Sequence, residues 1–182
     1  MAAVVGRRAL LIGIAGGVPL STAARAQGAV VVDAPCGPLR GAATRDGAQA
    51  FLGIPYAAPP VGPLRHASPR PAPRWTEPRD AARPGAASIQ TVGGAAAWLC
   101  EGAEPQCEDR LFLNVWTPDT SGRRPVMVWL HGGAWRTGRG DAAGTDGAAL
   151  AAGGDVVVVT ANYRLGALGW LAHPALANPE PD

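Results

Sequence analysis

The sequence contains no lysine, no basic stripe and no cluster of metal ligands, and each absence excludes a class of protein. All 16 basic residues are arginines scattered along the chain, so the pattern of a nucleic-acid-binding protein is missing. Heavy use of arginine, alanine, glycine and proline indicates a coding bias and not a function. With 47% hydrophobic residues and a net charge of +2, the 182 residues are expected to form one globular domain or part of one.

Cysteine is also scarce, and its pattern leaves two interpretations open. The three cysteines are an odd number, so at least one stays outside any intramolecular disulfide. Cys100 and Cys107 could form a disulfide across a loop in an oxidising compartment, with Cys36 left over. Two thiols in that loop are an equally good interpretation. No second Cys or His pair lies at ligand spacing, so we expect no metal and no cofactor.

The N-terminal residues have the three parts of a secretory signal peptide. A pair of arginines precedes an apolar stretch, residues 9–20, and a small-x-small cleavage site ends at Ala26. The apolar stretch is too short and too rich in glycine to span a membrane, and no other segment is a candidate. We expect cleavage to separate the signal peptide (1–26) from a secreted or periplasmic part (27–182). The paired arginines leave the Sec and the twin-arginine export routes open.

An apolar run rich in β-branched residues, Val126–Leu130, is the clearest strand in the sequence. Its composition is typical of a strand buried on both faces, as in a parallel sheet. His131, Gly132 and Gly133 follow, and the glycines let the backbone turn sharply while leaving room for a ligand. Exposed backbone N–H groups at such a strand end are suited to hold a negatively charged oxygen.

A second buried strand is predicted at Val156–Thr160, with a short helix before it at Asp146–Ala152. Asp146 is the expected N-cap of this helix, and Gly153-Gly154 is expected to close it. Strand, helix and strand then form a right-handed βαβ unit. Upstream, the pattern predicts shorter elements: a hairpin of residues 29–33 and 39–44, a strand at 50–54, a proline-rich loop that packs on the domain, and an alternating strand within 108–117.

Four stretches, in this order, resemble the type-B carboxylesterase and cholinesterase family of α/β-hydrolases. They are Phe51 to Arg65, Glu108 to Trp116, His131 to Trp135, and Asn162 to Gly169. The resemblance implies an α/β fold in which small N-terminal antiparallel strands precede a mostly parallel sheet with a βαβ crossover. It covers nearly everything after the signal peptide and ends before the nucleophile elbow of the family. We therefore expect the N-terminal part of an α/β-hydrolase fold, which is incomplete.

The resemblance also assigns roles in the loop after Val126–Leu130. The family's oxyanion-hole donors fall on the backbone N–H groups of Gly133 and Ala134, while Gly132 turns the loop and His131 orients it. Alanine in place of a third glycine keeps its N–H, so the donor is retained. Trp135, beside the hole, would line the acyl pocket or serve in packing.

Other parts of the family's pattern are absent. The nucleophile in a Gly-x-Ser-x-Gly elbow is missing, as are the acidic residue and the histidine that follow it. Structural roles are expected for all four serines of the chain, Ser21, Ser68, Ser88 and Ser121. Arg110 and Ser88 stand where the family has two disulfide-bonded cysteines. The Glu108-Asp109 pair is expected to be structural, in an ion pair with Arg40 or Arg164.

Three functions fit these features. The first is the N-terminal part of a serine esterase that, when complete, hydrolyses small or aromatic carboxylic esters. The second is a non-catalytic, cholinesterase-like binding module. The third is one half of a split esterase, completed by a C-terminal chain that carries the serine. The chain alone is expected to be inactive. Since the family places Val126–Leu130 between two strands and only one of these is in the sequence, we also expect an exposed apolar edge that promotes aggregation.

Overall fold

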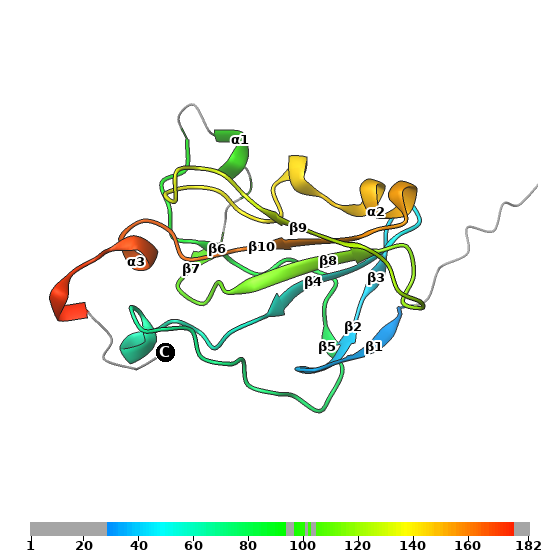
Figure 1. Ribbon diagram of the computed structural model, residues 1–182, viewed down its shortest axis with the longest axis horizontal. Coiled ribbons are helices and arrows are strands. Elements are labelled where there is room, and N and C mark those ends of the chain that lie inside the picture. Colours follow the sequence, from blue (N-terminus) through cyan, green and yellow to red (C-terminus); the bar gives the residue numbers. More distant parts are fainter. Residues whose placement is uncertain (1–28, 94–96, 101, 103–104, 177–182) are drawn as a thin grey trace, which may run out of the picture.

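The computed structural model describes residues 29–93, 97–100, 102 and 105–176 (Figure 1). The predicted signal peptide lies outside these residues. The largest element is a five-stranded sheet with the strand order β3-β4-β8-β10-β9. Its strands are β3 (Ala42–Ala43), β4 (Gln49–Pro55), β8 (Phe112–Thr117), β9 (Val126–Leu130) and β10 (Val157–Ala161). β9 and β10 pair in parallel, and the other neighbouring strands pair antiparallel.

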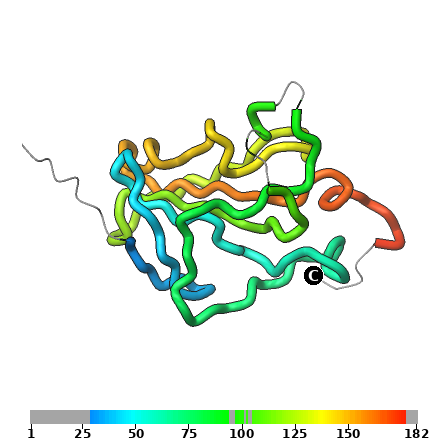
Figure 2. The backbone as a smooth tube through the Cα atoms, turned by 180° about the vertical axis from the view of Figure 1, so that it is seen from behind, coloured from blue at the N-terminus to red at the C-terminus, as the bar shows by residue number. Residues whose placement is uncertain are grey.

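Two smaller sheets accompany the main one. β1 (Val31–Ala34) and β2 (Gly37–Arg40) form a hairpin where one was predicted, and β5 (Arg79–Asp80) pairs with β2 in parallel. The predicted second strand, residues 39–44, is divided between β2 and β3, and β3 pairs with β4 in the main sheet. β6 (Ala87–Ser88) and β7 (Gln106–Cys107) form a separate parallel pair. Seen from the front and from behind, the N-terminal hairpin and the C-terminal helix α3 (Ala167–Trp170) lie at opposite ends of the molecule (Figures 1 and 2).

The helices are short. α1 (Ala97–Cys100) lies between β6 and β7 in the chain, and α2 (Ala148–Gly154) connects β9 to β10. Single turns of 3₁₀ helix are formed by Gly62–Leu64, Ala143–Thr145 and Pro174–Leu176. Within the described part of the chain, no helix has both the length and the apolar character needed to cross a lipid bilayer.

The predicted helix of the βαβ unit begins two residues later than expected. Its N-cap is Gly147 and not Asp146, although Asp146 Oδ1 accepts a 2.7 Å hydrogen bond from the Ala148 N–H. Glycine fits at this cap because a Cβ on Gly147 would lie 2.7 Å from Val158 Cγ1. Gly153-Gly154 belongs to the last turn, and Asp155, with φ +49°, ends the helix in a left-handed conformation.

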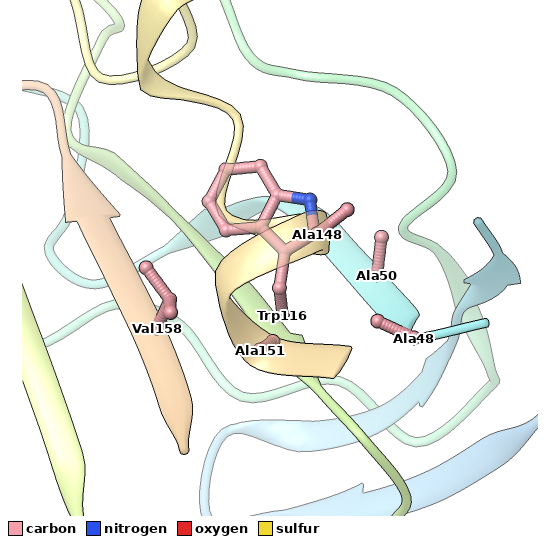
Figure 3. Packing of buried hydrophobic residues seen from close by; sticks show 6 residues of the cluster. All are labelled: Ala48, Ala50, Trp116, Ala148, Ala151 and Val158. Atoms are coloured by element: carbon pink, nitrogen blue, oxygen red, sulfur yellow. The ribbon is translucent and has the colours of Figure 1, made fainter. Parts of the chain in front are cut away.

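The main sheet is covered on both faces, but not over its whole width. α2 packs on one face, where small side chains let the helix approach the indole of Trp116 in β8 (Figure 3). The members of this cluster are Ala48, Ala50, Trp116, Ala148, Ala151 and Val158. The small sheet of β1, β2 and β5 covers the opposite face through a second cluster, formed by Leu39, Phe51, Ile54 and Ala81.

β9 lies at the edge of the sheet, with one strand neighbour among the described residues. Its side chains Val126, Val128 and Leu130 are 61%, 62% and 65% exposed. Met127, between Val126 and Val128, pairs in register with Val158, which is buried beneath α2. Because successive side chains of a strand point to opposite faces, Val126, Val128 and Leu130 point away from α2. The expected apolar edge is therefore present. The interpretation of this strand as buried on both faces is wrong for this chain, because no described element packs over Val126, Val128 and Leu130 on the face away from α2.

Candidate active site

The loop after β9 adopts a conformation that most sequences avoid. Gly133, Ala134 and Trp135 have φ angles of +116°, +53° and +56°. Gly133 also has no room for a side chain, since a Cβ would lie 2.1 Å from Thr137 O. For a residue as bulky as tryptophan, the left-handed region is costly by roughly 1–3 kcal/mol, and such strain is concentrated at functional sites.

Some backbone groups of this loop form the hydrogen bonds of a turn, and others have no hydrogen-bond partner among the described residues. The Gly133 carbonyl accepts hydrogen bonds from the N–H groups of Arg136 (3.0 Å) and Thr137 (3.1 Å), which closes the turn. The N–H groups of Gly133 and Ala134 donate to no residue in the described part of the chain. They lie outside the strand pairing of β9 and are available to a ligand atom.

His131 is buried beneath this loop, at 3% exposure, and holds its shape. Its Nδ1 lies 2.8 Å from Gly132 O, so this nitrogen carries the proton and donates to the carbonyl. The ring stacks on Tyr163 with the centroids 4.2 Å apart, and the Tyr163 hydroxyl donates to His131 O. Burial lowers the pKa of His131, which keeps the imidazole neutral. A neutral, stacked and buried ring is suited to orienting the loop and poorly placed to act as a base.

The far side of the loop is held by a residue that the sequence did not single out. The Gln90 side chain accepts from the Gly138 N–H (2.6 Å) and donates to Gly138 O (2.9 Å). Gly138, with φ +114°, is pressed against the histidine, since a Cβ there would lie 2.2 Å from His131 Nδ1. This pair of hydrogen bonds fixes the exit of the loop, although Gln90 is 48 residues away in sequence.

The segment after β10 fixes the remaining side. Asn162 Oδ1 accepts from the Gly140 N–H (2.7 Å), and the Gly166 N–H donates to Trp135 O (2.7 Å). The proline-rich segment packs here too, as predicted, because the Tyr56 hydroxyl donates to Asn162 O (2.8 Å). Stretches that are far apart in the sequence therefore meet around the loop that follows β9.

Two hollows lie on this end of the molecule. A cavity of about 660 Å³ is bordered by Leu130, His131 and Tyr163, and a second of about 380 Å³ is bordered by Ala134 and Gly166. Trp135 and Trp170 border both. Trp135 thus lies at a cavity wall, and its place in an acyl pocket stays a prediction. The position of Trp170 was not predicted, because nothing in the sequence links it to the loop.

The ion pair of Glu108 differs from the one expected. Glu108 binds Arg65, with Arg65 Nε 2.7 Å from Glu108 Oε2, and not Arg40 or Arg164. This hydrogen bond lowers the pKa of Glu108. Arg164 instead donates to Ala67 O (2.8 Å) and Arg65 O (3.3 Å). Glu108 is therefore structural, as predicted, and joins the proline-rich segment to the start of β8.

Arg110 has an unusual environment for a charged residue. It is fully buried, and burial lowers its pKa. Nη1 lies 3.4 Å from Cys107 O, while Nε and Nη2 have no hydrogen-bond partner in the described part of the chain. Ser88, at the other position where the family has a cysteine, is also buried, and its hydroxyl donates to Tyr163 O.

Cys107 is a free thiol whose Sγ lies 2.7 Å from Asp109 O, so the structure does not contain the Cys100–Cys107 disulfide. The described residues include no group of three or more His, Cys, Asp or Glu arranged to bind a metal. Among them, no serine hydroxyl is hydrogen-bonded to a histidine. The nucleophile, base and acid of an esterase are thus not assembled by residues 29–93 and 105–176.

Comparison with known proteins gives one family. The model of the "Carboxylesterase family" matches residues 28–177. Phenmedipham hydrolase of Pseudarthrobacter oxydans is 45% identical over 135 residues, which are 72% of this chain and 27% of that protein. Fumonisin B1 esterase of Sphingopyxis macrogoltabida is 45% identical over 136 residues, 74% of this chain and 24% of that protein. Para-nitrobenzyl esterase of Bacillus subtilis is 44% identical over 129 residues, 70% and 26% of the two chains.

Solved structures agree. A thermophilic PNB esterase has a TM-score of 0.73 at 40% identity, covering 80% of this chain and 30% of that one. A carboxylesterase of Geobacillus stearothermophilus has a TM-score of 0.70 at 41% identity, covering 78% and 27%. The fold is therefore part of the α/β-hydrolase fold of these esterases. The chain spans about a quarter of the length of the curated relatives it matches.

Proposed function

The chain belongs to the carboxylesterase family, and from this premise we propose that it is the oxyanion-hole part of a serine-dependent carboxylic ester hydrolase. The observation that supports the proposal is the pair of N–H groups on Gly133 and Ala134, which are unpaired among the described residues and held in a strained loop. A plain structural turn has no need of this strain, whereas an oxyanion hole needs donors fixed before the reaction begins.

In the proposed reaction, a serine hydroxyl attacks the ester carbonyl, and the carbonyl oxygen becomes an oxyanion. The N–H groups of Gly133 and Ala134 donate to this oxygen as its charge develops. Each donor of this kind is worth about 10²–10³ in kcat. His131 does not move a proton in this scheme, because its Nδ1–H is committed to Gly132 O. Its contribution is to keep the Gly132 carbonyl turned away from the oxyanion.

The serine must come from polypeptide outside the described residues, either from the same protein or from a separate chain. The open edge of β9 favours such a completion, since it offers a full strand of unpaired backbone groups beside the oxyanion loop. This edge is the observation that keeps the split-esterase alternative in consideration. A binding module without catalysis would gain nothing from the strained amides, so we favour the esterase. The proposed substrate is a small or aromatic carboxylic ester, and no cofactor is proposed.

Complementation tests the proposal. The chain is co-expressed with the part of the Bacillus subtilis para-nitrobenzyl esterase that follows the matched region, and hydrolysis of para-nitrophenyl acetate is measured. We expect activity from the pair and none from either half. Replacing Ala134 by lactic acid, introduced by suppression of a stop codon, exchanges the N–H for an ester oxygen and still permits φ +53°. It should lower kcat by about 10²-fold or more, whereas Ala134→Gly keeps the N–H and should remain active.

Co-purification of the two halves controls for misfolding of the lactic acid variant. Full activity of a complex that lacks the N–H at position 134 would refute the donor role. Hydrolysis by the chain alone at enzymatic rates would refute the absence of a nucleophile.

We also propose that the chain is exported and cleaved after Ala26. Fractionation of expressing cells, followed by mass spectrometry of the N-terminal peptide, should detect a mature protein that begins at Gln27 outside the cytoplasm. An intact N-terminus in the cytoplasm would contradict the proposal.

A further inference from the structure

Two tryptophans face each other beside the candidate oxyanion loop. The ring centroids of Trp135 and Trp170 are 5.4 Å apart at an interplanar angle of 49°, and the two residues are 60% and 56% exposed. Leu171, next in the chain, is 53% exposed. A contiguous apolar surface of this kind, at the wall of a hollow, is typical of a binding site.

The indoles are held in place although they are exposed. The Trp170 indole Nε1–H donates to Arg164 O (2.9 Å), and the Trp170 backbone N–H donates to Gly166 O (2.9 Å). Gly169 permits this tight turn, because a Cβ there would lie 2.4 Å from Arg164 O. The Gly166 N–H, in turn, binds Trp135 O (2.7 Å). These hydrogen bonds fix the orientation of the Trp170 indole and the position of the Trp135 backbone, which lowers the entropy lost when a ligand binds.

Packing within the described chain does not explain the pair. Trp135 adopts φ +56°, an unfavourable conformation for its size, and most of its side chain is left in solvent. Both tryptophans border the 660 Å³ hollow and the 380 Å³ hollow, and Ala134 borders the smaller one. A group placed against Trp170 in the smaller hollow therefore shares that hollow with Ala134.

We propose that Trp135 and Trp170 form a binding site for an aryl group of the ester, with the ester carbonyl directed toward Ala134. The inference rests on the proposed function and narrows its substrate to aryl esters. The site should favour an aromatic ring over a saturated ring of the same size. The quadrupoles of two aromatic rings attract each other in offset and edge-to-face arrangements, and a tilted pair of indoles offers both. This preference amounts to roughly twofold to tenfold in affinity. Trp170 is a specificity-determining residue in this proposal and not a catalytic one.

Photoaffinity labelling of the dilute chain tests the site without requiring hydrolysis. The probe is methyl 4-benzoylbenzoate, a benzophenone ester, and the labelled residues are located by mass spectrometry. We expect labelling at Trp170, Leu171 and Trp135. Methyl benzoate should compete roughly twofold to tenfold better than methyl cyclohexanecarboxylate.

Three variants make the test specific. Trp170→Leu should abolish the preference for methyl benzoate, and Trp170→Phe should retain most of it. Trp98→Leu is the matched control, since Trp98 is 59% exposed and lies in α1 and not beside the loop. Labelling that includes Trp98 to the same extent, or a preference unchanged in Trp170→Leu, would overturn the inference.

The experiments can refute the proposed hydrolase function and the proposed aryl site independently of each other. If the complemented pair does not hydrolyse esters while Trp170 is labelled with the expected preference, the aryl site stands as a binding site and the proposed function fails. If hydrolysis is observed and the preference for aryl competitors is absent, the aryl site alone is wrong.

Discussion

A lysine placed in the middle of β9 should reduce the self-association of this chain. The strand is an unpaired edge, and Val126, Val128 and Leu130 are exposed on one face of it. Parallel edges with apolar side chains pair with other chains unless a charge or a covering element prevents it. Val128→Lys puts a charge at the centre of this edge, at a position already 62% exposed, so the folded chain loses little packing.

The structure sets the size of the effect. Complete burial of a Val or Leu side chain is worth about 1.5–3 kcal/mol, and each of the three is about three-fifths exposed, so covering them recovers roughly 1–2 kcal/mol each. Together they contribute about 3–5 kcal/mol to association, which corresponds to roughly 10²–10⁴ in the association constant. Val128→Lys removes about a third of this and adds repulsion between like charges. The association constant should fall by about tenfold or more.

Sedimentation velocity and static light scattering over a concentration series measure the change. The chain should associate at low concentration, and the onset for Val128→Lys should move to about tenfold higher concentration. Val92→Lys is the matched control, because Val92 is an exposed valine in a loop and gains the same charge away from β9. If the unsubstituted chain is monomeric and unfolds cooperatively across the series, or if Val92→Lys acts equally, the reasoning from the edge strand is wrong.

Three further predictions concern stability, and urea denaturation of dilute protein tests each. Arg110→Met should raise the free energy of unfolding by about 1–3 kcal/mol. The buried guanidinium has two unpartnered nitrogens, and methionine is an apolar side chain of similar length. A decrease in the free energy of unfolding would indicate a partner for the charge. Tyr163→Phe should lower it by about 1 kcal/mol through loss of the hydrogen bond to His131 O, and no change would remove this bond from the support of the loop. Burial holds the pKa of His131 below its ordinary value, so the unfolded chain binds a proton more readily than the folded chain does. The free energy of unfolding should therefore be highest above about pH 6.5 and should fall as the pH is lowered through that value. His131→Gln should weaken this dependence; a pH dependence that is unchanged in His131→Gln would contradict the assignment.

The strands nearest the site were predictable because local signals define them. β9 begins after Pro125 and ends before His131-Gly132, and its predicted bounds, Val126–Leu130, are confirmed. β10 is displaced by one residue from the prediction, at Val157–Ala161. The α2 N-cap was misplaced because Asp146 and Gly147 both favour a helix start. Close contact of Gly147 with Val158, which no local pattern reveals, decides between them.

Contacts between distant segments were not predictable in the same way. The partner of Glu108 is Arg65, 43 residues away, and the partner of the Gly138 backbone is Gln90. A sequence with 16 arginines offers many partners of equal chemistry for one carboxylate, and the path of the proline-rich loop selects among them. The contact of Trp135 with Trp170 likewise depends on how the segment after β10 folds back over the loop.

These long-range contacts bear on how the proposed hole is made. The loop is held at its start by Tyr163 on His131, at Trp135 by Gly166, and at its end by Gln90 on Gly138. All three holding residues lie within the described part of the chain. The strained conformation is therefore a property of this segment and does not await a serine-bearing segment to impose it. Catalysis by an oxyanion hole depends on donors that need no reorganisation during the reaction. A completing polypeptide would then have to supply only the nucleophile, its base and its acid, at the position that the edge of β9 already defines.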